Sequence, residues 1–371
     1  MGSSAKPPPK AFLTSGKQLP LAFFRTACFA IAMASDASAP TAVSSRFAER
    51  FRLAAQGGTT LRFDAFMKVA LFDDEVGYYR RDRPRVGRHA AADFYTATSS
   101  GPLFGELVTA ACVQLLGSQD PRTFTFVEVG AEPGRTVLDD VPHPFGATQV
   151  CRLGDRWTPP PKAVVFSNEL FDAQPFRRVV YRDGAWREGA VRIQEDQTLA
   201  EVEWPVPPRE LVPRLPAAAT EGYRLDLPLD AVGLLAGLTA PGWQGLFIAF
   251  DYGKSWREMT DALPAGTARA YHQHQQVKDL LARPGEQDLT CHVCWDWLDA
   301  ALAGNGFSPR QVQSQEAFFM THAAGAIETV VAAEAERFSA RKMGLMQLLH
   351  PGNMGQKFQV LWGIRAAKDS P

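Results

Sequence analysis

The chain has 371 residues, of which 46% are hydrophobic and 21% are charged, and its formal net charge is −1. This balance gives no broad basic field of the kind that non-specific nucleic-acid binding requires, so we expect no nucleic-acid partner. The five cysteines are an odd, scattered set, which argues against a secreted disulfide scaffold and fits a reducing compartment.

The first 45 residues differ from the rest, because they are rich in Ser, Ala and Pro and carry no acidic residue before Asp36. Their apolar run is interrupted by Arg25 and is too short to span a bilayer, so we expect no stable membrane insertion. Three interpretations stay open: a signal peptide, a mitochondrial transit peptide, or an over-long start of a chain whose translation begins at Met33. We therefore treat residues 1–45 as a disordered leader or a misassigned start, and residues 46–371 as the folded domain.

Residues 46–120 are predicted to form a mainly helical N-terminal part. Apolar residues at i+3 and i+4 steps in residues 60–72 indicate an amphipathic helix. Residues 80–92 carry several arginines and are expected to form a basic loop. Residues 102–116 indicate a further helix, with a proline at its start and Gly117 just after its end.

Short apolar runs then predict the strands of a doubly wound sheet. They lie at residues 123–130, 148–153, 162–169, 245–251 and 357–364. The first ends in a glycine, and the third and fourth end in polar residues. Such a layout is typical of buried parallel strands, and ligands bind such sheets beyond the carboxyl ends of the strands.

The pattern between residues 176 and 240 is different. Two alternating segments flank Asp183-Gly184, a dipeptide that strongly favours a β-hairpin, so we predict an inserted hairpin region here. Helices are predicted at residues 229–238 and 295–302, and over most of residues 323–349.

Two polar segments at predicted strand ends are candidate functional sites. In Val127-Glu-Val-Gly-Ala-Glu-Pro-Gly-Arg, a glycine turn lets the backbone approach a bound nucleoside closely, although an ordinary tight turn has the same pattern. Asn168, Glu169 and Asp172 follow another strand. A pair of carboxylates there can hold a guanidinium with two hydrogen bonds, and the alternative is that these side chains cap the next helix.

Three histidines and two cysteines raise the alternative of a metal site. His272, His274 and His292 lie near Cys291 and Cys294, which have Cys-x-x-Cys spacing. No second pair of this kind exists in the sequence, so we expect no metal site.

Many motifs in series resemble those of one family. They are Thr60-Leu-Arg-Phe-Asp-Ala-Phe-Met, Gly77-Tyr-Tyr, Asp93-Phe-Tyr-Thr, Leu103-Phe-Gly-Glu, Val127-Glu-Val-Gly, Pro133-Gly-Arg, Ser167-Asn-Glu-Leu-Phe-Asp-Ala-Gln-Pro, Asp251-Tyr-Gly, Arg269-Ala-Tyr, Gly285-Glu-Gln-Asp-Leu-Thr and Met354-Gly-Gln-Lys-Phe. From about residue 59 to 365 the chain is similar to the MidA-like methyltransferases, which include the mitochondrial complex I assembly factor that methylates arginine.

The resemblance implies an α/β class I methyltransferase fold (Rossmann-like), S-adenosylmethionine as the methyl donor, and a protein arginine as the acceptor. A subunit of respiratory complex I is one candidate substrate, and the implied compartment is the cytoplasm of a bacterium or the mitochondrion of a eukaryote. The residues implied at the donor site are Asp93, Thr96, Glu128, Gly130, Gly134 and Asp155. Asn168, Glu169 and Asp172 would lie where donor and acceptor meet.

The sequence departs from the family pattern in the donor loop. Ala131 and Glu132 are extra, Thr136 replaces the last family glycine, and only Asp155 is available as the acid that holds the ribose. One alternative is therefore a catalytically degenerate relative that serves as a scaffold or assembly factor. Another is a dinucleotide-dependent oxidoreductase, but the chain lacks a complete Gly-x-Gly-x-x-Gly motif.

Overall fold

The computed structural model describes residues 41–81, 101–204, 211–273, 275–336 and 339–366. All of them belong to one compact unit, Met33–Pro371. The predictions for the leader, for most of the basic loop, and for Asp93 and Thr96 fall outside the described residues. Within these residues, no helix is both long and apolar enough to cross a membrane.

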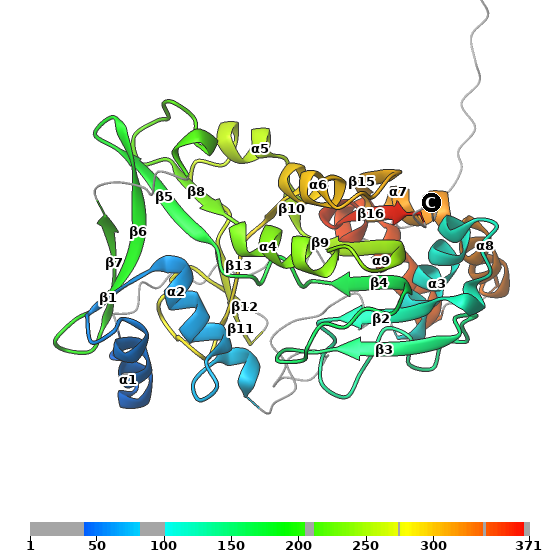
Figure 1. The fold of residues 1–371 in the computed structure, drawn as a ribbon, viewed down its shortest axis with the longest axis horizontal. Helices are drawn as coiled ribbons and strands as arrows, with labels where there is room; N and C mark the ends of the chain where they lie inside the picture. The colour runs from blue at the N-terminus through cyan, green and yellow to red at the C-terminus, as the bar shows by residue number, and fades with distance from the viewer. Residues whose placement is uncertain (1–40, 82–100, 205–210, 274, 337–338, 367–371) are drawn as a thin grey trace, which may run out of the picture. The chain divides into compact units, whose positions relative to one another are not determined.

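The described residues include a six-stranded sheet with the order β15-β16-β9-β4-β2-β3, which Figure 1 shows with β3 at one edge. Its strands are β2 (Thr125–Val129), β3 (Ala147–Cys151), β4 (Lys162–Asn168), β9 (Gln244–Asp251), β15 (Arg310–Ser314) and β16 (Gln359–Arg365). Strands β3, β2, β4 and β9 are parallel, and β16 and β15 close the sheet in antiparallel pairs. The predicted mixed α/β class is confirmed.

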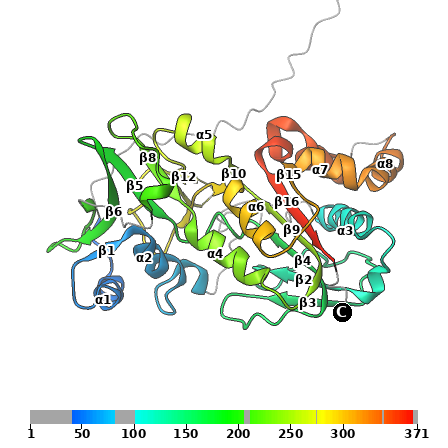
Figure 2. The same ribbon diagram turned by 45° about the horizontal axis from the view of Figure 1, so that its top comes forward.

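Helices cover both faces of this sheet (Figure 2). One face packs against α3 (Pro102–Leu116), α7 (Gln315–His322), α8 (Ala324–Ala333) and α9 (Ala340–Leu349). The other packs against α4 (Leu229–Leu238) and α6 (Trp295–Gly304). Strands β4 and β9 are therefore buried on both faces, which explains why their sequences are continuous apolar runs.

Two connections between parallel strands contain no helix. Residues 130–146 join β2 to β3, and residues 152–161 join β3 to β4, through turns alone. Parallel strands are usually joined through a helix, but prolines and glycines recur in both segments and prevent a helix from forming. The edge strand β3 is thus only partly covered, and its first two residues are exposed.

A second sheet has five strands among the described residues, in the order β1-β6-β5-β8, with β7 also paired to β6. The strands are β1 (Thr60–Arg62), β5 (Arg177–Arg182), β6 (Ala185–Ile193), β7 (Leu199–Trp204) and β8 (Arg224–Leu227). Strands β5 and β6 form an antiparallel hairpin around Asp183 and Gly184, whose φ angles of 51° and 77° suit a two-residue hairpin turn.

The N-terminal segment packs on this second sheet through α1 (Ser45–Ala54) and α2 (Phe63–Met67). The prediction of one helix over residues 60–72 is wrong. Leu61 pairs with Val191 of β6, so the segment starts as a strand, continues as α2 and ends as a π-helix at Lys68–Phe72. Pairing with a distant strand overrides the local helical periodicity here.

Several short strands and one short helix lie between residues 253 and 294. Strands β11 (Arg269–His272), β12 (Gln275–Val277) and β13 (Asp288–Thr290) form a three-stranded sheet. Strands β10 (Gly253–Lys254) and β14 (Val293–Cys294) form a parallel pair, and α5 (Trp256–Asp261) follows β10.

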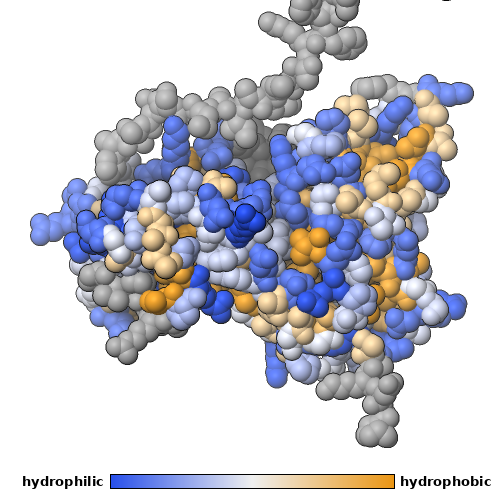
Figure 3. All heavy atoms as spheres, turned by 90° about the horizontal axis from the view of Figure 1, so that it is seen from above, coloured by the Kyte–Doolittle hydropathy of each residue, from blue (hydrophilic) through white to orange (hydrophobic). Residues whose placement is uncertain are grey.

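Apolar side chains are also exposed on the helices that cover the first face of the six-stranded sheet. Met320, Val331, Met343 and Met346 lie on α7, α8 and α9, and each is about half exposed. Figure 3 shows apolar residues on the same side of the molecule as α7 and α8 in Figure 2. None of the four lies at a carboxyl end of a parallel strand, where ligands of such sheets bind.

Candidate active site

The end of β9 holds the turn that follows β4. The buried carboxylate of Asp251 accepts hydrogen bonds from the backbone N–H groups of Phe171 (2.8 Å), Asp172 (3.3 Å) and Tyr252 (2.8 Å). A buried carboxylate that accepts several backbone bonds is a strong local constraint. Asp251 therefore fixes the backbone on which the predicted site residues stand.

The turn after β4 has an uncommon backbone conformation. Glu169 has a φ of 51°, in the left-handed region that non-glycine residues seldom adopt, and its N–H donates to the carbonyl of Phe250 (2.9 Å). The Asn168 amide donates to a carboxylate oxygen of Glu169 (3.1 Å). The Asn168 Oδ1 atom is buried and has no donor among the described residues, as expected for an atom that meets a ligand.

Four carboxylates influence one another at this place. We call Glu169, Asp172, Asp251 and Asp288 the acidic cluster. Burial raises the pKa of Asp172 well above its usual range, and the negative charges of Asp251, Glu169 and Asp288 raise it further. Burial also raises the pKa of Asp251 to about 7, although bonds from the backbone N–H groups oppose this rise. Because these like charges repel, a cation placed among them would be stabilised.

Tyrosines accompany the acidic cluster. The hydroxyl of Tyr79 donates to Asp288 Oδ1 (2.8 Å), across 209 positions of sequence. Burial, and then the charges of Glu169 and Asp172, raise the pKa of Tyr252. Burial also raises the pKa of Tyr271; the charge and hydrogen bond of Arg269 oppose this rise, and Asp172 and Asp288 add smaller increases. Aromatic rings beside carboxylates suit the binding of an organic cation.

The predicted donor loop, which follows β2 and begins at Gly130, lies against this turn. Gly130 has a φ of 81°, and a Cβ atom added there would lie 2.8 Å from Cδ1 of Leu170, in the turn after β4. Glycine is thus favoured at this position by its conformation, and a larger residue would also have to displace the Leu170 side chain. Gly134 has a φ of 75° with open space around it, so glycine serves only the conformation there.

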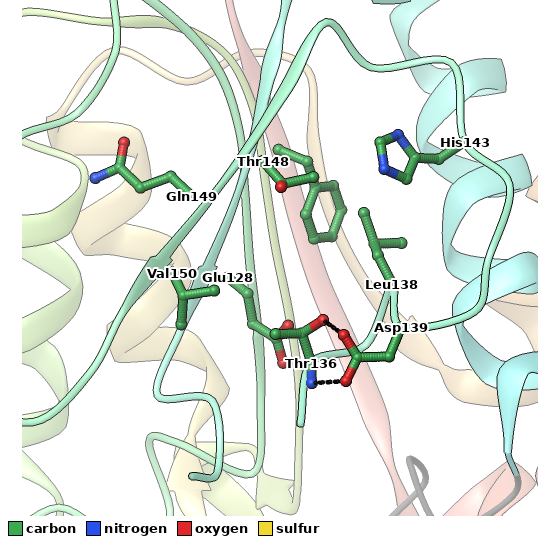
Figure 4. Close-up of a pocket in the computed structure, with 9 residues that line it drawn as sticks. Glu128, Thr136, Leu138, Asp139, His143, Thr148, Gln149 and Val150 are labelled. Carbon is green, nitrogen blue, oxygen red and sulfur yellow. Dashed lines mark hydrogen bonds between the residues drawn. The ribbon is translucent and has the colours of Figure 1, made fainter. Parts of the chain in front are cut away.

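Glu128 ties the donor loop to β2. Its buried carboxylate accepts a hydrogen bond from the N–H of Val137 (2.8 Å), and burial raises its pKa to about 7. Beside it lies a cavity of about 130 Å³. Its lining residues, drawn in Figure 4, are Phe126, Glu128, Thr136, Leu138, Asp139, His143, Thr148, Gln149 and Val150. The cavity is smaller than most small-molecule sites, which have roughly 300–1,000 Å³.

Backbone N–H groups of the donor loop bond within the chain. Gly130 donates to the carbonyl of Cys151 (2.9 Å). Thr136 donates through its N–H (2.8 Å) and its hydroxyl (2.6 Å) to the carboxylate of Asp139, as Figure 4 shows. A carboxylate of the chain itself therefore accepts both polar hydrogens of Thr136.

Asp155 lies in the exposed turn that follows β3. Its carboxylate accepts a hydrogen bond from the N–H of Arg152 (2.8 Å), which closes the turn. The end of β3 is adjacent to Gly130 through the bond to Cys151, so Asp155 follows the strand next to the donor loop. The assignment of Asp155 to the ribose stays a prediction.

The sequence-based site omitted five residues that the structure brings to it. They are Tyr79, Asp251, Tyr252, Tyr271 and Asp288. All five lie inside motifs that carried the family resemblance, and that location is the signal that could have identified them.

Of the residues that could form a metal site, His274 lies outside the described residues. Cys291 and Cys294 are buried free thiols, and burial lowers the pKa of His292 to about 4. Within the described part of the chain, no group of three or more His, Cys, Asp or Glu side chains is placed to hold a metal ion. Burial raises the pKa of the thiols at Cys112, Cys151, Cys291 and Cys294, which is about 12 for Cys294.

The chain is similar to known proteins in sequence and in fold. Residues 148–312 match the model of a family described as "putative S-adenosyl-L-methionine-dependent methyltransferase". A crystal structure of a "likely methyl transferase" from Burkholderia thailandensis, bound to S-adenosylhomocysteine, is 24% identical to this chain. The similarity covers 88% of this chain and 95% of that one, with a TM-score of 0.76.

A native structure of an uncharacterised superfamily protein from the same organism is 23% identical, with the same coverage and a TM-score of 0.73. At these identities the likeness establishes a shared fold. No curated protein matches the chain. The match to the family model, together with the shared fold, confirms the resemblance of this chain to the MidA-like methyltransferase family.

Proposed function

We propose that this chain is an S-adenosylmethionine-dependent methyltransferase whose acceptor is the guanidinium group of a protein arginine. The observation that carries the proposal is the acidic cluster, which lies against the loop where the family binds its donor. Buried carboxylates beside tyrosines favour a planar organic cation. A complex I subunit is the acceptor protein that the resemblance suggests.

The side chains of the acidic cluster can each contribute to such a reaction. Glu169 and Asp172 would bind and orient the guanidinium, whose positive charge offsets their mutual repulsion. Asp172, whose pKa is raised by burial and by its acidic neighbours, would accept the proton that the guanidinium loses. The bound donor would supply the methyl group, and the protein's contribution is mainly alignment in a site that excludes water.

The described residues fit only part of S-adenosylmethionine. A parallel strand that ends in Gly130 is a suitable place for the nucleoside. No helix begins in residues 130–146, and N–H groups there already bond to carboxylates of the chain. The N–H groups of Thr136 and Val137 are therefore not available to the α-carboxylate of the donor.

That misfit favours a second candidate function. A chain that kept the fold and lost the donor site would serve as a scaffold or assembly factor, and the helix-free connection after β2 is the observation in its favour. Binding of the donor separates the two proposals, because only the first requires it.

The test combines calorimetric titration of S-adenosylmethionine with transfer of a radiolabelled methyl group to arginine-containing peptides. Methylarginine, identified after acid hydrolysis, is the expected product. Replacing Asp172 with Asn should lower kcat/KM by roughly tenfold to a hundredfold, since it removes a charged partner of the acceptor. The matched control is Asp183→Asn in the exposed hairpin turn, which should leave kcat/KM unchanged.

Donor binding without methylarginine would contradict the assignment of the acceptor. Absence of donor binding at millimolar concentration would contradict the methyltransferase proposal as a whole and leave the scaffold.

A further inference from the structure

The turn at residues 76–81 interlocks with the residues that precede β13, beside the acidic cluster. A Cβ atom added to Gly285 would lie 2.2 Å from the carbonyl oxygen of Val76, so the two backbones are in direct contact. Arg81 and Glu286 form an ion pair (3.5 Å). The two segments are therefore held together at both ends of the turn, although they are far apart in the sequence.

Tyr79 extends this contact into the acidic cluster. Its hydroxyl donates to Asp288 Oδ1 (2.8 Å), and its ring stacks on Phe72 with the ring centroids 5.4 Å apart and an interplanar angle of 15°. The N–H of Leu289 donates to the same oxygen of Asp288 (2.9 Å). Asp288 is only 4% exposed, so these two bonds fix the direction of a buried carboxylate.

The charge of Asp288 acts at the place where the acceptor is proposed to bind. Burial, and then the charges of the acidic cluster with Asp288 among them, raise the pKa of Asp172. Tyr271 of β11 pairs with Asp288 in the three-stranded sheet. A cation bound at Asp172 would therefore also lie in the field of Asp288. Because a hydrogen bond to a carboxylate favours its ionised form, the Tyr79 hydroxyl helps to keep this charge in place.

From these contacts we infer that Asp288 helps to hold the acceptor cation, and that Tyr79 is a positioning residue that acts on the acceptor through Asp288. The inference rests on the proposed function, since it concerns the acceptor site of that reaction. It adds a third carboxylate to Glu169 and Asp172, and it gives the N-terminal part of the chain a role in substrate selection. The buried Oδ1 atom of Asn168, which has no donor among the described residues, independently points to a ligand with N–H groups at this place.

The test compares two peptides that differ in charge. One is a blocked pentapeptide with a central arginine between glycines, and the other has citrulline at that position, which has nearly the same shape and no charge. Calorimetric titration of both into the full chain measures the preference for the cation. Tyr79→Phe keeps the stacked ring and removes the hydroxyl, so it should weaken binding of the arginine peptide by about threefold to tenfold and leave the citrulline peptide unchanged.

A double-mutant cycle tests whether Tyr79 acts through Asp288. Asp288→Asn should also reduce the preference for the arginine peptide, and in that background Tyr79→Phe should not reduce it further, because the charge on which Tyr79 acts is gone. Tyr181→Phe is the matched control, since it removes a tyrosine hydroxyl from β5 and should leave both affinities unchanged. Equal effects of Tyr79→Phe on both peptides, or an undiminished effect in the Asp288→Asn protein, would overturn the inference.

The failure of this inference differs from the failure of the proposed function. If the parent chain prefers the arginine peptide and Tyr79→Phe keeps that preference, the proposed acceptor stands and the role of Tyr79 is wrong. If the parent chain binds the arginine peptide no better than the citrulline peptide, the proposed acceptor is wrong, and the inference falls with it.

Discussion

A single buried carboxylate, that of Glu128, couples the donor loop to the sheet. Burial raises its pKa from 4.5 to about 7, so the folded state favours its protonated form. The stability that this group contributes is present below pH 4.5 and is lost as the pH rises toward 7. The Glu128→Gln variant should lack this pH dependence, which amounts to roughly 3 kcal/mol of the free energy of unfolding.

Urea denaturation of both proteins at a series of pH values between 4 and 8 measures this difference. Asp172 and Asp251 contribute in the same direction, but they are present in both proteins and cancel in the comparison. Equal slopes for the two proteins would mean that Glu128 titrates normally in the fold.

Asp251 is the residue on which the turn after β4 depends. In Asp251→Asn an amide nitrogen replaces one carboxylate oxygen, so at least one of the N–H groups of Phe171, Asp172 and Tyr252 loses its acceptor. We expect a loss of roughly 1–3 kcal/mol in the free energy of unfolding, because a buried donor is left unpaired. Chemical denaturation checks this, with Asp261→Asn on the exposed face of α5 as the control. If both variants are equally stable, Asp251 does not hold the turn.

One glycine of helix α3 lies against residues 130–146, the helix-free connection between β2 and β3. A Cβ atom on Gly105 would lie 2.1 Å from the carbonyl oxygen of Val137. Gly105→Ala should therefore displace that backbone and lower the free energy of unfolding by roughly 1–3 kcal/mol. Gly233→Ala in α4 is the matched control, because no atom lies within 4 Å of its added Cβ.

The control should be more stable than the parent chain by roughly 0.5–1 kcal/mol, since alanine favours a helix over glycine. Thermal denaturation of the two variants is the measurement. If the Gly105→Ala protein is as stable as the Gly233→Ala protein, the backbone at Val137 can move away from α3 without a loss of stability.

Elements whose character is local could be predicted from the sequence. Strands β4 and β9 are continuous apolar runs, and α3 carries its proline and glycine at its two ends. The strand at Thr60–Arg62 could not be predicted, because only pairing with β6 makes it a strand. The acidic cluster was predicted in part: Glu169 and Asp172 follow a strand directly, whereas the bond from Tyr79 to Asp288 depends on tertiary structure.

At the scale of the whole molecule, the chain passes back and forth between its two larger sheets. After β1 in the five-stranded sheet, β2 to β4 enter the six-stranded sheet, β5 to β8 return to the first, and β9 lies in the second again. Neither sheet is one continuous segment, so we expect the described part of the chain to unfold cooperatively.

Circular dichroism at far-ultraviolet wavelengths and tryptophan fluorescence should therefore give coincident denaturation curves. The fluorescence reports on both sheets, since Trp186 lies in β6 and Trp362 in β16. Two separated transitions would show that one sheet persists after the other has unfolded.

The reaction of the buried cysteines with a thiol reagent can report local opening of the structure. Cys112 lies in α3 and Cys294 in β14, and burial suppresses the thiolate at both positions, so a thiol reagent can modify them only after the surrounding structure opens. The labelling rate at each cysteine then reports how often the surrounding structure opens. Helix α3 packs on the six-stranded sheet, and β14 pairs with β10, which directly follows β9. The labelling rate at Cys112 therefore measures opening of the core, and the rate at Cys294 measures opening of the region next to the acidic cluster.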